Sequence, residues 1–272
     1  MEIRVETLED KNAVIRFEKT LADIAHSLLN IYPNVKDDLE KIIGWKIDFC
    51  ISIILIKDSN TFYRIAGNSH IVAFAQPSKH LIVIDASKIA VKPFSQEIIL
   101  KHELCHLLLH RYIALNTMPK WFEEGVCQWV TGGIGEILHD KRPSLNNAVI
   151  SGTLIKLDDL KENFPKNKTS LDLAYEESRS IVEFIGSTYS TGKILEILNY
   201  LKDGESFEYA FEKAISMTTE EFEKKWQDSF SPHLYWLLFF AQNIYEIIFF
   251  GMAAITIFAF IKYIIKRQKD VQ

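Results

Sequence analysis

The chain has 272 residues, of which 48% are hydrophobic and 25% are charged, and its formal net charge is -5. This profile is typical of a folded globular protein and argues against disorder. The mild acidity argues against nucleic acid as a partner, because nucleic-acid-binding proteins carry a basic footprint. The cysteines are Cys50, Cys105 and Cys127, and their small, odd number argues against a disulfide framework. They include no C-x-x-C pair, which argues against a structural zinc knuckle or a redox centre.

The first half of the chain has the pattern of a small sheet with a helix. Residues 1–18 contain an expected edge strand centred on 13–17. Apolar residues at helical spacing then predict a helix over 21–43, which Pro33 breaks or kinks. Runs of β-branched and apolar residues predict three further strands, at 49–57, 71–75 and 81–84, the last two joined by a turn at 77–79.

The second half is predicted to be mainly helical. Residues 131–168 are rich in glycine, proline and asparagine and are expected to form loops. Thr218 and Glu221 have the spacing of a capping box at a helix start. The expected helices lie at 95–111, 119–130, 173–189, 192–201, 206–214 and 219–230. Strands followed by helices predict an α+β domain over 1–230, with a small mixed sheet before the helical half.

The C-terminal region differs in composition from the rest. Residues 244–265 are almost wholly apolar and long enough to cross a bilayer as a helix, with a short basic tail at 266–272. The aromatic-rich juxtamembrane segment at 231–243 fits either a membrane surface or a packed amphipathic helix of the soluble domain. We therefore expect a single-pass membrane protein with the lipid bilayer as one partner.

The residues 102–106 read HELCH and have the pattern of a zinc site. On a helix, His102 and His106 project from one face and can bind one zinc ion. Glu103 would then face the open position of the ion and act as a general base toward water. Cys105, between the two histidines, is interpreted as a helix-packing residue.

A catalytic zinc ion needs a third protein ligand, for which the sequence offers three candidates. His110 lies eight residues beyond His102, or about 12 Å along a helix axis, which is too far for one ion. It is interpreted as a supporting or structural residue. Glu123 and Glu124 remain as candidates, on a second predicted helix that can cross the first.

The segments HELCH and PKWFEEGVCQWV resemble the gluzincin metallopeptidases, and most closely the bacterial peptidase MA-like group related to the M1 aminopeptidases. The resemblance covers roughly residues 45–230. It implies that Glu124, followed by Gly125, is the third zinc ligand. It also implies that Tyr175, in the segment AYEES, donates a hydrogen bond to the oxyanion that forms during hydrolysis.

One motif of the M1 aminopeptidases is missing. They carry Gly-x-Met-x-Asn on the strand before the zinc helix, whereas no methionine occurs here between Met1 and Met118. Aminopeptidase specificity is therefore in doubt, and an endopeptidase is the natural alternative. In that alternative, an edge strand at 80–85 would pair with an extended substrate backbone.

The function predicted from these residues is that of a membrane-anchored zinc metallopeptidase with a peptide or protein substrate. One alternative is a catalytically inactive peptidase-fold protein that serves as a binding protein or scaffold at the membrane. Another is a zinc hydrolase that acts on a substrate other than a peptide.

The basic tail and the start of the chain give opposite indications of topology. The positive-inside rule places the tail in the cytoplasm and the catalytic domain outside, which is the arrangement we favour. The first residues lack the pattern of a secretory signal, so either a signal precedes Met1 or the protein is tail-anchored with a cytoplasmic domain.

Overall fold

The computed structural model describes residues 5–68, 70–89, 95–132, 144–230, 240 and 243–269. The chain divides into two compact units, Met1–Trp226 and Gln227–Gln272. Each unit is described by itself.

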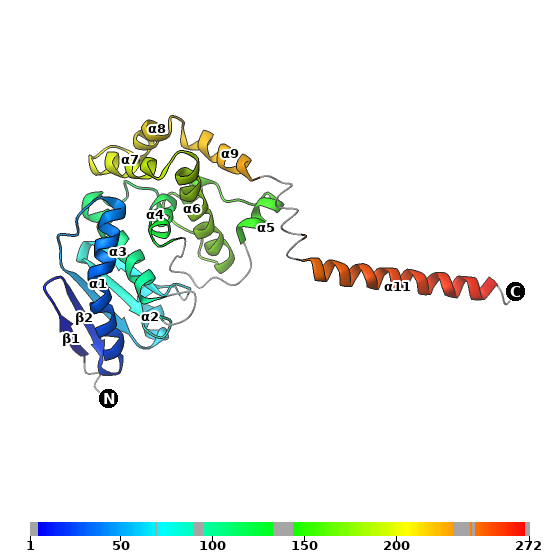
Figure 1. Ribbon diagram of the computed structural model, residues 1–272, viewed down its shortest axis with the longest axis horizontal. Coiled ribbons are helices and arrows are strands. Elements are labelled where there is room, and N and C mark those ends of the chain that lie inside the picture. Colours follow the sequence, from blue (N-terminus) through cyan, green and yellow to red (C-terminus); the bar gives the residue numbers. More distant parts are fainter. Residues whose placement is uncertain are drawn as a thin grey trace. The chain divides into compact units, whose positions relative to one another are not determined.

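The first unit contains a five-stranded mixed sheet (Figure 1). In chain order its strands are β1 (Val5–Glu9), β2 (Ala13–Glu18), β3 (Ile51–Ile56), β4 (Ala73–Gln76) and β5 (Leu81–Asp85). The spatial order is β1-β2-β3-β5-β4, in which β2, β3 and β5 are parallel and the outer strands β1 and β4 run antiparallel to their neighbours.

This order corrects two expectations about sheet edges. The strand over 13–18 has a partner on both sides, and β1 forms the edge next to it. The strand over 81–85 is also interior, because β3 and β4 both pair with it, and the edge on that side is β4. Strand order depends on pairings between distant segments, which a pattern of apolar residues within one strand does not specify.

Buried and partly exposed side chains alternate along strands such as β3, which explains how the sheet packs on the core. In β3, Ile51, Ile53 and Leu55 are buried while the residues between them are partly exposed. Alternate residues of a strand point to opposite faces, so one face of β3 contributes to the core. Ile15 pairs with Ile53, which pairs with Ile82, and this row of isoleucines crosses the three parallel strands.

The helix α1 (Ala22–Ile43) continues through Pro33, so of the two expected effects, a break or a kink, the break does not occur. Proline removes one backbone hydrogen bond from a helix interior. Leu28, Tyr32 and Leu39 are fully buried along this helix. Their burial offsets the lost bond, since burying such a side chain contributes about 1.5–3 kcal/mol.

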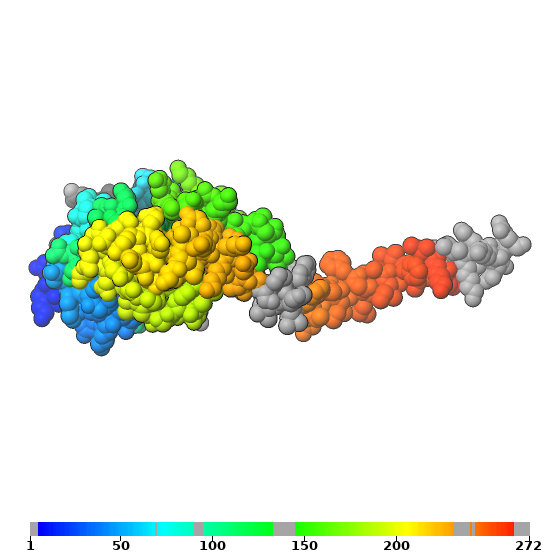
Figure 2. All heavy atoms as spheres, turned by 90° about the horizontal axis from the view of Figure 1, so that it is seen from above, coloured from blue at the N-terminus to red at the C-terminus, as the bar shows by residue number. Residues whose placement is uncertain are grey.

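The remaining elements of the first unit are mostly helical, and the predicted α+β class is confirmed. The helices are α2 (Ser59–Ala66), α3 (Gln96–Tyr112), α4 (Lys120–Val130), α5 (Ser144–Ser151), α6 (Lys168–Thr188), α7 (Thr191–Lys202), α8 (Phe207–Ile215) and α9 (Thr219–Ser229). Short 3-10 turns lie at Lys19–Leu21, Pro77–Lys79 and Leu157–Leu160. The later helices α7 to α9 gather on one face of the unit (Figure 2).

Two helices differ from the sequence prediction. No helix was predicted over α2, whose exposed Tyr63 and Ile65 obscure its amphipathic pattern, although Asp58 caps it by accepting a hydrogen bond from the Thr61 amide. The helix α5 lies within the stretch that was expected to form loops. The capping box is confirmed, because the backbone amides of Thr218 and Glu221 each donate to the other's side chain.

The second unit contains the helix α11 (Ile244–Lys269). Its segment Ile244–Tyr263 has a mean hydropathy of 2.2 over 20 residues, which is long and apolar enough to cross a membrane by length and composition. Most of the predicted juxtamembrane segment and the end of the basic tail lie outside the described residues.

Candidate metal centre

The helix α3 carries the HELCH motif through the core of the first unit. Its start is capped by Ser95, whose hydroxyl accepts a hydrogen bond from the Ile98 amide. All residues from 102 to 109 are buried, with His102 1% exposed and Glu103 fully buried. Ionisable side chains are rarely placed in a core without a partner, because desolvation disfavours their charged form. This burial therefore indicates a structural or chemical role.

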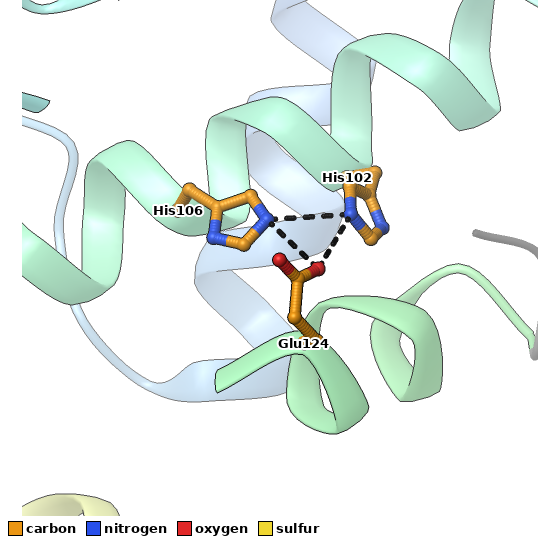
Figure 3. A group of neighbouring side chains, drawn as sticks. All are labelled: His102, His106 and Glu124. Carbon is orange, nitrogen blue, oxygen red and sulfur yellow. Dashed lines mark hydrogen bonds and ion pairs between the residues drawn. The ribbon is translucent and has the colours of Figure 1, made fainter. Parts of the chain in front are cut away.

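Three side chains converge between α3 and α4 (Figure 3). His102 Nε2 lies 3.3 Å from His106 Nε2, and Glu124 Oε2 lies 3.6 Å from each of these nitrogens. Two ligands of a tetrahedral zinc ion, each bound at about 2.0–2.1 Å, lie about 3.3–3.4 Å apart. The spacing and the donor set of two imidazoles and one carboxylate thus fit a zinc ion.

A second carboxylate, Glu123, supports His106 from the side opposite this group. Its Oε1 atom lies 2.6 Å from His106 Nδ1 and 2.9 Å from His110 Nε2. Burial raises the pKa of Glu123, but hydrogen bonds from both histidines outweigh burial and bring the pKa to about 2. An ionised carboxylate only accepts hydrogen bonds, so both ring nitrogens donate to it. His106 is thereby oriented with Nε2 toward His102 and Glu124, a common arrangement behind metal-binding histidines.

Lys120 holds the other oxygen of the Glu124 carboxylate. Its Nζ lies 3.4 Å from Glu124 Oε1, one helical turn earlier on α4, and 5.4 Å from the centre of the Phe164 ring. Burial raises the pKa of Glu124, but His106 and Lys120 outweigh it and hold the pKa well below its usual value. The carboxylate is therefore ionised, with Oε2 turned toward the two histidines.

The close packing of α4 against α6 explains why residue 125 is a glycine. A Cβ atom at this position would lie 2.4 Å from the backbone oxygen of Ser178 and 2.5 Å from Val182 Cγ2. Gln128 adds a hydrogen bond of 3.1 Å to the backbone oxygen of Tyr175. Any side chain at Gly125 would push the helices apart, so this glycine fixes the distance between the Glu124 helix and the Tyr175 helix.

A cavity of about 640 Å³ opens beside the convergent side chains. Glu103, His106 and Glu124 are among its lining residues. Other lining residues come from α2, the loop after it, β4, the segment before α6 and α6 itself, and the apolar ones include Ile71, Phe74, Phe164, Leu171 and Tyr175. Tyr175 is buried, packs edge-to-face with the Phe164 ring and lies within α6.

The structure thus brings together the predicted trio of His102, His106 and Glu124, with Glu103 and Tyr175 on the same cavity. The sequence reasoning missed two contacts. The spacing of Lys120 and Glu124 was a visible signal for an ion pair within a helix. Nothing in the local sequence pattern indicated that Glu123 bridges two histidines of another helix.

A family model described as the peptidase MA superfamily matches residues 62–231, which is more than half of the chain. The chain belongs to the peptidase MA superfamily. The resemblance drawn from the two motifs is confirmed. The matched region includes α3, α4 and α6, which carry the convergent side chains and Tyr175.

A solved structure described as native yeast LTA4 hydrolase is similar over 82% of this chain, with 13% sequence identity and a TM-score of 0.48. The match covers 38% of that protein, so this chain spans much less than its full length. No curated protein matches the chain.

Proposed function

We propose that the chain is a zinc metallopeptidase, with zinc held by His102, His106 and Glu124. The observation that carries this proposal is the convergence of two imidazole nitrogens and one carboxylate oxygen at 3.3–3.6 Å from one another. Membership of a peptidase superfamily supports a peptide or protein as the substrate. A zinc ion would supply a Lewis acid that polarises the scissile carbonyl and lowers the pKa of water to about 7.

Glu103 is proposed as the general base. It lies directly after His102 and lines the cavity together with His106 and Glu124. Its carboxylate would accept a proton from the attacking water and pass it to the nitrogen of the leaving amine. The water oxygen bonds to the carbonyl carbon, the bond from that carbon to the nitrogen breaks, and the products are a carboxylic acid and an amine.

Tyr175 is proposed to donate a hydrogen bond to the oxyanion of the tetrahedral intermediate. It lines the same cavity as Glu103 and His106, and its ring packs against that of Phe164. A donor that is already positioned where negative charge develops stabilises the transition state. The contact of Gly125 with α6 supports this role, because it fixes the helix that carries Tyr175.

Membrane anchoring through α11 is part of the proposal. The apolar length of Ile244–Tyr263 supports it, and the basic residues after this segment favour an extracytoplasmic catalytic domain. An epitope in the exposed loop at Lys166, probed with protease on intact cells, distinguishes the two sides. Digestion of the epitope supports the outer location, and full protection contradicts it.

The test of the catalytic proposal is Glu103→Gln. This substitution keeps the size of the side chain and leaves all three proposed ligands in place. We expect a normal zinc content and a loss of hydrolysis of at least about 100-fold, the scale of general-base catalysis. Zinc by elemental analysis and peptide cleavage by chromatography measure the two quantities. Hydrolysis at the wild-type rate would remove Glu103 from the mechanism.

A further inference from the structure

A second cavity, of about 700 Å³, adjoins the first. The two cavities share five lining residues, which we call the neck: His110, Leu115, Lys120, Glu123 and Asn163. The second cavity extends from the neck along the loop between α3 and α4 toward the start of α8, where Phe207 and Glu208 line it.

The neck directly contacts the proposed metal ligands. Glu123 is hydrogen-bonded to His106 at 2.6 Å, and Lys120 is paired with Glu124 at 3.4 Å. The convergent side chains therefore lie close to the junction of the two cavities. A peptide bond placed at the metal would have room for further residues on both of its sides.

We propose that the two cavities form one cleft that binds an internal stretch of an unfolded polypeptide, so that the enzyme is an endopeptidase. The inference rests on the proposed zinc peptidase function and adds the class of substrate. Each cavity falls within the range of about 300–1,000 Å³ that encloses a whole small ligand. A single terminal residue would fill part of one cavity and leave the other empty, whereas an extended chain fills both.

The charges in the first cavity argue against recognition of a free amino terminus. An ammonium group in such a site needs an ionised partner to offset its desolvation. The described carboxylates that line this cavity are Glu103, Glu123 and Glu124. Glu123 is bonded to two histidines, Glu124 faces the same histidines and Lys120, and Glu103 is the proposed base. Within the described lining, every carboxylate thus has another role.

Other residues that line the first cavity fit an extended peptide instead. Phe74 and Ala75 of β4 line the cavity, and β4 is the strand at that edge of the described sheet. An edge strand can pair with the backbone of an added strand, and this pairing requires neither end of the peptide. Ile71, Phe74 and Leu171 offer apolar contact, so we expect an apolar side chain on this side of the cut.

The test uses the full-length, zinc-loaded protein in detergent and an internally quenched peptide of ten residues with an apolar residue at its centre. One version is acetylated and amidated, and two others carry a free amino or a free carboxyl end. We expect an internal cut in all three, with kcat/KM values within about threefold of one another. Mass spectrometry identifies the cut. Release of single residues from either free end, with no cut in the blocked peptide, would overturn the inference and leave the peptidase function intact.

The same assay separates the failure of the inference from that of the proposed function. If the wild type cuts none of the three versions of the peptide, the inference and the proposed function both fail. Any cleavage that Glu103→Gln abolishes upholds the peptidase function, and the position of the cut then decides the inference alone.

A variant tests the second cavity directly. Thr117 lines only this cavity, and Thr117→Trp would fill part of it. We expect the ratio of kcat/KM for the ten-residue peptide to that for a blocked four-residue peptide to fall about tenfold. Thr188→Trp is the matched control, because Thr188 is exposed at the end of α6 and lines neither cavity. An unchanged ratio in Thr117→Trp would exclude the second cavity from the cleft.

Discussion

The helices α3 and α11 are both rich in apolar residues, but they depart from ordinary burial in opposite ways. In α3, ionisable side chains lie in the core, with His102, Glu103 and His106 all buried. In α11, large apolar side chains such as Phe249 and Phe258 are exposed. Buried charge and exposed apolar surface are the informative exceptions in a folded protein. The first supports the proposed metal chemistry and the second supports the proposed membrane anchor.

The largest expected effect comes from removing the exposed apolar helix. Deletion of residues 231–272 leaves the whole first unit and the end of α9. We expect this form to move from the membrane fraction to the soluble fraction, because insertion of a spanning helix is effectively irreversible. Ultracentrifugation and immunoblotting measure the distribution. Retention of the shortened protein in the membrane fraction would contradict anchoring by α11.

The next effect concerns the packing that holds the buried site together. Gly125→Ala places a methyl group 2.4 Å from a backbone oxygen of α6. The clash is with backbone, so it cannot be relieved by the rotation of a flexible side chain. Overpacking of this kind typically costs about 1–3 kcal/mol of unfolding free energy. Denaturant titration measures the change.

The matched control for this variant is Gly186→Ala, also within a helix. A Cβ there meets its nearest atoms at an ordinary 3.6 Å. We expect Gly186→Ala to be neutral or to stabilise by up to about 1 kcal/mol, since alanine is favoured over glycine in helices. Equal effects of the two substitutions would mean that the close approach at Gly125 does not matter.

The smallest effect concerns Glu177, a buried carboxylate outside the metal site. It accepts a hydrogen bond from the Ile155 amide, and burial raises its pKa to about 8. A carboxyl group with a raised pKa in the folded state favours folding below its unfolded pKa of 4.5, and that contribution is lost as the pH rises toward 8. Glu177→Gln should therefore raise Tm by a few degrees at pH 9 and have little effect at pH 4.5.

Calorimetry at the two pH values checks this dependence. Glu183→Gln provides the control, because Glu183 is exposed on the same helix. An equal change of Tm at pH 4.5 and pH 9 in Glu177→Gln would contradict the assignment.

The contrast between local and non-local features also explains what the sequence could predict. The spacing of His102 and His106 depends only on helical geometry, and both the helix and the pair were predicted. A long apolar helix over 244–265 was predicted as well, where the structure has α11, since length and composition suffice for that prediction. Glu124 came from the resemblance to a family and not from the spacing, because the crossing of two helices is a tertiary feature.

Several of the features that were missed or wrong depend on contacts between distant segments. The strand over 81–85 was expected at an edge, but β4 covers it. The bridge from Glu123 to His106 and His110 joins two helices, and the close approach of Gly125 joins α4 to α6. Such contacts are set by tertiary packing. Hydrophobic periodicity shows which face of an element is buried, but not which other element packs against that face.

The measurement that tests the central claim most directly is the zinc content of the purified full-length protein, compared with that of Glu124→Ala. We expect about one zinc ion per chain in the wild type, because the three convergent atoms have the spacing of tetrahedral ligands. The variant, folded by circular dichroism, should retain little zinc after dialysis against a weak chelator. A wild type without zinc, or a variant that keeps it fully, would contradict the metal centre.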